Sequence, residues 1–165
     1  MMPTSSHLKS PPPVDAEARQ RALVEKCEAL GIPVTAQRRA VLAAVLALDS
    51  HPTADEVFDH LVGEGAEVSR ATVYRTLDSL VELGLVAKTC HPGRGVRFDR
   101  VNTAHHHLVC LQCNAMVDFV DDALDGLRVP DLGSLGFQVT DYRVQVRGLC
   151  QACQSSSTND HPSRS

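Results

Sequence analysis

Two pairs of cysteines in the C-terminal part of the chain have the spacing of a metal site. Cys110 and Cys113 form one CxxC pair, and Cys150 and Cys153 form the other. Four thiolates can enclose one Zn²⁺ in a closed tetrahedral site. Two matched pairs favour this interpretation over a redox-active CxxC or a disulfide framework. The sequence therefore predicts a structural zinc site, with a small subdomain between the two pairs.

Three consecutive histidines directly precede the first cysteine pair. In a strand, His105 and His107 lie on one face and His106 on the other. With the nearby Asp99 and Asp118 they form a ligand set suited to Fe²⁺, Mn²⁺ or Zn²⁺. Such a site could also activate water in a metalloenzyme, but the sequence contains no aromatic pocket lining or phosphate-binding motif. Chance clustering of histidines, in a purely structural zinc-ribbon module, is a further alternative.

Length and composition set the frame in which these ligands must be positioned. The 165 residues, 43% hydrophobic and 22% charged, suffice for one mid-sized domain or two small ones and exclude collagen-like, coiled-coil and wholly disordered chains. The net charge of −4 excludes a generally basic protein that coats nucleic acid, but allows a local basic patch. Residues 1–13 lack the apolar core of a signal peptide, and no apolar run is long enough to span a membrane. We therefore expect a cytoplasmic protein with reduced thiols.

The first half of the chain has the pattern of a winged helix-turn-helix. Thr35 and Ser69 are expected N-caps, and Thr53 with Glu56 forms an expected capping box. Cys27 and Cys90 are expected to be packing residues. The predicted elements are helices over 15–30, from 35, from 53 and over 70–83, followed by strands over 85–90 and 96–98.

Basic and hydroxyl side chains gather in the N-terminal half of the fourth helix. A recognition helix presents its first residues to base edges in the major groove, while flanking arginines contact phosphates. A solvated helix face is the alternative explanation. The candidate DNA contacts are Arg38, Arg70, Thr72, Tyr74 and Arg75, with Arg39 near the second helix and Arg94 and Arg97 on the wing as further basic groups.

The second half of the chain is predicted to be mainly strand. We expect strands over 107–111, 116–120 and 137–146, with a short helix over 121–127. The predicted fold is α+β. Its parts are a disordered tail over 1–14, a winged-helix domain over 15–100, a hinge over 101–104, a second domain over 105–153 and a disordered tail over 154–165.

Several motifs together resemble the ferric uptake regulator (Fur) family of bacterial metal-dependent repressors. The resemblance covers roughly residues 15–153. It rests on VTAQR at 34–38, HPTAD at 51–55, ATVYRTL at 71–77, RFD at 97–99, HHHLVC at 105–110 and the two CxxC pairs. The resemblance implies a homodimeric regulator, not an enzyme, that binds double-stranded operator DNA. It also implies that residues 105–153 form an α/β dimerisation domain.

The resemblance further implies a regulatory metal site with ligands from both domains. By position, these ligands are His51, Asp99, His105, His107 and Asp118. Fe²⁺ or Mn²⁺ bound there would tie the winged helix to the dimerisation domain and select an arrangement that fits DNA.

One ligand position bears on which branch of the family the chain resembles. Asp118 stands where iron-sensing members usually carry Glu, and Asp there is similar to the peroxide-sensing PerR branch. In that branch peroxide reacts at Fe²⁺ and oxidises a ligand histidine, here His51 or His105, which releases DNA. The alternatives are an iron-responsive uptake regulator, which Arg75 and Thr76 also resemble, and a zinc sensor, which Asp99 disfavours because such members often have Cys there.

The chain departs from the family's pattern at the accessory metal site. Its histidines correspond to Ala104 and Tyr142 in this chain. We therefore expect no accessory site.

Overall fold

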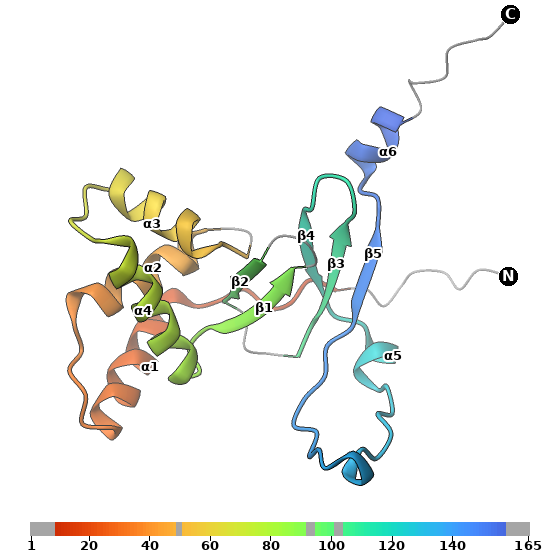
Figure 1. The fold of residues 1–165 in the computed structure, drawn as a ribbon, viewed down its shortest axis with the longest axis horizontal. Coiled ribbons are helices and arrows are strands. Elements are labelled where there is room, and N and C mark those ends of the chain that lie inside the picture. The colour runs from red at the N-terminus through yellow and green to blue at the C-terminus, as the bar shows by residue number, and fades with distance from the viewer. Residues whose placement is uncertain (1–8, 49–50, 92–94, 101–103, 158–165) are drawn as a thin grey trace, which may run out of the picture. The chain divides into compact units, whose positions relative to one another are not determined.

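The computed structural model describes residues 9–48, 51–91, 95–100 and 104–157. The chain divides into two compact units (Figure 1). One is Pro12–Asn102, and the other combines Thr103–Ser165 with Met1–Pro11. Helices with two small sheets confirm the predicted α+β class.

Four helices build the first unit, and each begins at a residue whose side chain accepts a backbone N–H. The capping box is complete, because Thr53 Oγ1 accepts from Glu56 N (3.1 Å) while Glu56 Oε2 accepts from Thr53 N (2.7 Å). The helices are α1 (Ala16–Ala29), α2 (Ala36–Ala47), α3 (Ala54–Gly63) and α4 (Arg70–Glu82), with N-caps Asp15, Thr35, Thr53 and Ser69. All the predicted caps are confirmed.

The helices pack around one apolar core. It includes Leu23 of α1, Leu42 of α2, Val57 of α3 and Leu77 of α4, each fully buried. Cys27 is also fully buried within this core, which confirms that it is a packing residue.

A two-stranded hairpin follows α4 and completes the winged helix (Figure 1). Strands β1 (Ala87–His91) and β2 (Gly95–Asp99) pair antiparallel. Phe98 of β2 is buried in the helical core, so the hairpin is anchored to the helices. Arg94 and the side chain of Cys90 lie outside the described residues.

The second unit contains a three-stranded sheet in the order β4-β3-β5 (Figure 1). The central strand β3 (His106–Cys110) pairs antiparallel with β4 (Met116–Phe119) and parallel with β5 (Gln145–Gly148). Helix α5 (Asp122–Asp125), a 3₁₀ turn η1 (Gly133–Leu135) and α6 (Gln151–Ser157) complete the unit.

Several boundaries in the second unit differ from the prediction. The strand expected over 137–146 is instead β5, which begins at Gln145, where the parallel pairing with β3 starts at His107. The helix expected over 121–127 is one turn, ended by Gly126.

The tails also differ from the prediction. Residues 154–157 continue α6, where Gln154 N donates to Cys150 O (2.9 Å). Lys9 forms an isolated β-bridge with Val120. Residues 1–8 and 158–165 of the expected tails, and 101–103 of the expected hinge, lie outside the described residues. Within the described ranges, none of the helices is both long and apolar enough to cross a membrane.

Candidate metal centres and nucleic-acid interface

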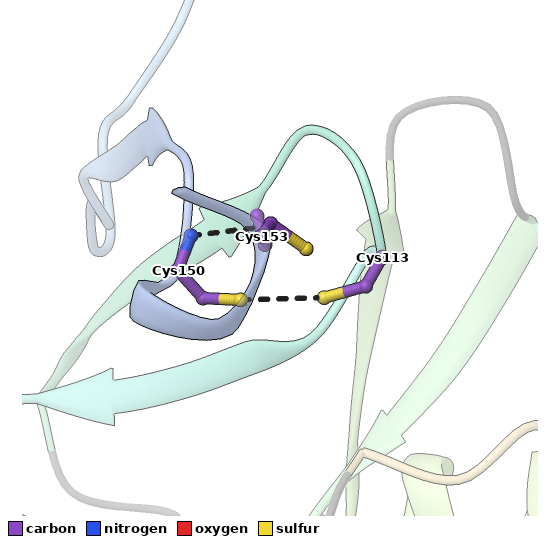
Figure 2. A group of neighbouring side chains, drawn as sticks. Cys113, Cys150 and Cys153 are labelled. Atoms are coloured by element: carbon purple, nitrogen blue, oxygen red, sulfur yellow. Dashed lines mark hydrogen bonds between the residues drawn. The ribbon is translucent and has the colours of Figure 1, made fainter. Parts of the chain in front are cut away.

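The four cysteines of the CxxC pairs lie together in the second unit. Their sulfur atoms all lie within 4.8 Å of one another. Figure 2 shows the thiols of Cys113 and Cys150 facing each other, with 3.7 Å between the two sulfurs. Zn–S bonds of about 2.3 Å in a tetrahedron separate the sulfurs by about 3.8 Å. The thiols present therefore fit one zinc ion.

Two of these thiols differ strongly in acidity. The pKa of Cys110 is lowered to about 5, first because the backbone N–H of Cys150 donates to its sulfur (3.4 Å) and then because the backbone N–H of Cys113 does. The pKa of Cys153 is raised to about 12, first by its hydrogen bond with the Cys150 side chain and then by burial. Cys110 is therefore a thiolate at neutral pH, whereas Cys153 keeps its proton until a cation displaces it.

In the first unit, a histidine and an aspartate face each other. His51 lies two residues before the N-cap of α3, and Asp99 is the last residue of β2. His51 Nε2 lies 3.8 Å from Asp99 Oδ1, and both side chains are buried. The backbone sets this placement, because Phe98 N donates to Pro52 O (2.8 Å) and so holds β2 beside the segment before α3.

Two arginines on or next to β2 hold this pair in place. Arg97 Nη1 donates to His51 O (2.6 Å) and lies 3.4 Å from Glu56 Oε2. Arg100 Nη1 donates to Leu46 O (3.0 Å) at the end of α2. Arg97 lies on the wing strand β2 as expected, but its side chain is only 14% exposed and makes its contacts inside the unit.

Sequence reasoning missed this role of Arg97. Its partner is a backbone carbonyl far away in the chain, so residue type and spacing do not reveal it. The available signal was that Arg97 and Asp99, two residues apart in a strand, share a face.

In the second unit, three further predicted ligands come together. His105 Nε2 lies 3.0 Å from His107 Nε2, which in turn lies 3.6 Å from Asp118 Oδ1. The register of β3 and β4 places His107 opposite Asp118. As predicted, His105 and His107 lie on one side of the strand, and both are buried.

The distances within each unit suit metal ligands. Bonds of about 2.1 Å to one ion place neighbouring ligand atoms about 3 Å apart in an octahedron. The pairs described above are separated by 3.0 Å, 3.6 Å and 3.8 Å. Imidazoles with carboxylates are also the donor set that Fe²⁺, Mn²⁺ and Zn²⁺ share. Each unit therefore brings together its own members of the predicted regulatory set.

His106 faces a different environment from its two neighbours. Its Nδ1 accepts from Val144 N (3.1 Å), and its Nε2 lies 3.1 Å from Asp125 Oδ1. The ring of Tyr142 stacks beside it, with 6.4 Å between ring centroids, and Tyr142 Oη donates to the carbonyls of Leu124 (2.7 Å) and Asp125 (2.6 Å). Of these residues, His106, Asp125 and Tyr142 line a cavity of about 380 Å³. Hydrogen bonds thus join β3, α5 and the segment before β5.

The predicted DNA contacts on α4 divide into engaged and exposed side chains. Arg70 forms an ion pair with Asp55, lies 3.6 Å from Asp59 and stacks over the Phe58 ring at 4.3 Å. The hydroxyl of Thr72 shares a hydrogen bond with Ser69 Oγ (2.9 Å). The first residues of α4 therefore also hold α3 and the helix cap.

The remaining candidates lie on α4 and α2. Tyr74 is 47% exposed and Arg75 is exposed. Arg38, near the start of α2, is half-buried and donates to Pro33 O. Tyr74 and Arg75 are thus the more accessible of the predicted DNA contacts.

Comparisons with known proteins agree with this architecture. Residues 29–147 match the model of the ferric uptake regulator family. The chain is 33% identical over 136 residues to the peroxide operon regulator of Bacillus subtilis, covering 82% of this chain and 94% of that protein. It is 32% identical over 144 residues to the peroxide-responsive repressor PerR of Staphylococcus aureus (strain Mu50), covering 86% and 97%.

Solved structures show the same fold. The ferric uptake regulator of Pseudomonas aeruginosa, determined with manganese, superposes with a TM-score of 0.64 at 25% identity. The match covers 78% of this chain and 97% of that one.

Proposed function

The chain belongs to the ferric uptake regulator family, and we propose that it is a metal-dependent transcriptional repressor that binds operator DNA as a homodimer. One observation carries the proposal. Each compact unit contains its own buried group of imidazole and carboxylate ligands, and one of the units is a winged helix.

The regulatory metal is held by ligands from both units in this proposal. His51 and Asp99 bind from the winged helix, and His105, His107 and Asp118 bind from the second unit. One Fe²⁺ or Mn²⁺ ion, if bound there, would supply the positive charge that all these donors share. The liganded chain then adopts one arrangement of its units, which increases operator affinity, and the metal-free chain loses that constraint.

The four cysteines have a separate, structural role. Cys110, Cys113, Cys150 and Cys153 hold Zn²⁺ and thereby fix the β3–β4 turn to the start of α6. The spacing of the thiols and the thiolate character of Cys110 support this assignment.

Helix α4 is the proposed recognition helix. Tyr74 and Arg75 contact base edges, and Thr72 lies near them in the first turn of the helix. Arg38 and Arg70 contact phosphates. Arg70 then exchanges its carboxylate partners on α3 for a phosphate, so part of its binding energy is spent on breaking those ion pairs.

Peroxide releases the repressor through a ligand histidine in this proposal. Fe²⁺, if bound by these ligands, would supply the redox chemistry that activates peroxide beside the ligand histidines. In the net reaction one hydrogen peroxide transfers an oxygen atom to a ring carbon of His51 or His105, and its second oxygen leaves as water. The modified ring no longer binds as an imidazole, so the metal no longer constrains the chain and the operator is released.

The sheet of the second unit offers a face for dimerisation. Leu108, Val117 and Val146 lie on β3, β4 and β5 and are 43%, 57% and 41% exposed. With Phe119 and Leu124 they line a hollow of about 350 Å³. Covering these apolar side chains with the same face of a second copy removes them from water.

Operator binding with different metals tests the proposal. The affinity is measured for protein loaded with Fe²⁺, Mn²⁺ or Zn²⁺, each before and after peroxide. We expect Fe²⁺-loaded protein to release DNA after peroxide and Mn²⁺-loaded protein to stay bound. Mass spectrometry should then find one added oxygen on a peptide that contains His51 or His105.

Other results would assign a different regulator. If Fe²⁺-loaded protein keeps its affinity after peroxide and no histidine is modified, the chain is an iron-responsive uptake regulator. If Zn²⁺ alone increases affinity, it is a zinc sensor. If no metal changes operator binding, the proposed function is wrong.

A further inference from the structure

Arg97 connects the candidate metal ligands of the first unit to its helix-turn-helix. We propose that Arg97 is a positioning residue that transmits metal binding at His51 and Asp99 to α3 and α4, and that it is not a DNA contact. This inference rests on the proposed function, because it assigns the route by which the metal acts within the winged helix.

Strand β2 contacts both the side chain and the backbone of His51. Arg97 and Asp99 alternate along β2 and therefore share a face. Asp99 Oδ1 faces the His51 imidazole at 3.8 Å, and Arg97 Nη1 donates to the His51 carbonyl at 2.6 Å. One strand thus holds the side chain and the backbone of His51 at the same time. A change in the position of His51 must move the Arg97 guanidinium or break its hydrogen bond.

Glu56 connects Arg97 to the start of α3. Glu56 Oε2 lies 3.4 Å from Arg97 Nη1 and also accepts from Thr53 N at 2.7 Å. The same oxygen therefore belongs to the capping box that begins α3. Through Glu56, the guanidinium joins the backbone of His51 to the N-terminus of α3.

Helix α3 is in turn connected to the proposed recognition helix α4. Before DNA binds, Asp55 of α3 forms an ion pair with Arg70, the first residue of α4. The apolar packing between the two helices does not depend on this pair and persists when Arg70 turns to a phosphate. Val57 of α3 and Val73 of α4 are both buried in the common core. The two helices consequently move together, and a shift at the start of α3 reaches α4.

The burial of Arg97 distinguishes this role from a phosphate contact. Its side chain is 14% exposed, and its Nε atom is buried with no hydrogen-bond acceptor among the described residues. An unsatisfied buried donor lowers stability, so packing alone does not explain an arginine here. The hydrogen bond to the His51 carbonyl and the ion pair with Glu56 explain why an arginine stands at this position.

The test compares operator affinity with and without Mn²⁺ across a salt series. The variants are Arg97→Ala, Arg97→Lys and Glu56→Gln, since Gln can still accept from Thr53 N but carries no charge for Arg97. The matched control is Lys88→Ala, which removes an ion pair (2.7 Å to Asp78 Oδ1) between the same hairpin and α4. Circular dichroism follows the fold and the melting temperature.

We expect Arg97→Ala to reduce the Mn²⁺-dependent gain in affinity by about tenfold. Its affinity without metal and its salt dependence should stay close to those of the wild type. Arg97→Lys should recover part of the gain, because an ammonium can reach one acceptor at a time. Glu56→Gln should lose part of it, and Lys88→Ala should retain it.

Three results overturn the inference. An equal loss of affinity with and without metal, with a salt slope shallower by about 1, identifies Arg97 as a phosphate contact. An equal loss with a lower melting temperature identifies a purely structural residue. If Arg97→Ala does not fold, an unchanged metal-dependent gain in Glu56→Gln excludes the route. A wild-type chain with no metal response contradicts the proposed function itself, and that result is read before any variant.

Discussion

Neighbouring residues of the short strand β3 differ in their chemical roles because their surroundings differ. His107 faces Asp118 across the sheet, whereas the adjacent His106 faces Asp125 and Tyr142. Cys110, at the end of the same strand, is a thiolate because backbone N–H groups converge on its sulfur. Identical residue types therefore do not share a role, and each has to be tested by itself.

The zinc assignment predicts the effect of removing one thiolate. Cys110→Ser should lose the bound zinc, since a hydroxyl is a poor ligand for Zn²⁺, and the second unit should unfold or fail to associate. Elemental analysis of zinc per chain and thermal unfolding measure both effects. Cys27→Ala, in the helical core, should keep its zinc. Full zinc content in Cys110→Ser would contradict the site.

The regulatory assignment predicts a different effect for Asp118. Asp118→Ala should keep the fold but lose metal-dependent operator binding, because it removes a carboxylate ligand without disturbing the core. Asp118→Glu should retain metal dependence, as it supplies the same donor one methylene further out. Asp141→Ala, an exposed carboxylate in the same unit, is the control. Metal-dependent binding by Asp118→Ala would exclude this residue from the site.

Some features of single helices and strands could be predicted from the sequence, and others could not. The N-caps at Thr35, Thr53 and Ser69 could be predicted because capping depends on neighbouring residues. Strand β5 could not be delimited, because its length depends on where a distant strand begins. The types of the metal ligands could be predicted from their spacing along the chain. The role of Arg97 could not be predicted, because its partner His51 lies far away in the sequence.

Helix α4 should depend on its cap. Ser69 Oγ accepts from Thr72 N at 3.1 Å, so Ser69→Ala should lower the free energy of unfolding by about 1 kcal/mol. Urea denaturation measures this loss. Ser69→Asp supplies another acceptor and should preserve most of the stability. Equal stability of Ser69→Ala and the wild type would show that the cap contributes nothing.

The cluster around His106 should also stabilise the second unit. Tyr142→Phe removes the hydroxyl that donates to the carbonyls of Leu124 and Asp125, and should cost about 1 kcal/mol of unfolding free energy. The metal content per chain should not change, because the bond joins protein groups only. A lower metal content in Tyr142→Phe would instead place Tyr142 at a metal site.

In the whole molecule, the two units carry different functional groups. The helical unit carries the candidate DNA contacts and two of the proposed regulatory ligands, and the sheet unit carries the other proposed ligands, the cysteines and the exposed apolar face. The proposed regulation by metal therefore requires both units, and the proposed recognition of the operator by a dimer requires two copies.

The proposed dimer depends on the exposed sheet face. Val117→Asp places a charge among apolar side chains and should shift the protein to monomers in sedimentation velocity, because burying an unpaired carboxylate is unfavourable. Arg147→Asp, at an exposed position one residue from Val146 and so on the other face of β5, should remain dimeric. If Val117→Asp stays dimeric, the interface lies elsewhere.

The bridge between Lys9 and Val120 has a topological consequence. Lys9 N donates to Val120 O (3.1 Å), and Val120 N donates to Lys9 O (2.8 Å), so the chain passes from Lys9 in the sheet unit through the helical unit and back to the sheet. The helical unit is therefore an insertion between two segments of the sheet unit, and its two connections differ in kind. A proteolytic cut before α1 leaves the peptide chain after β2 intact, whereas a cut after β2 leaves the fragments connected by non-covalent contacts, among them the two hydrogen bonds between Lys9 and Val120.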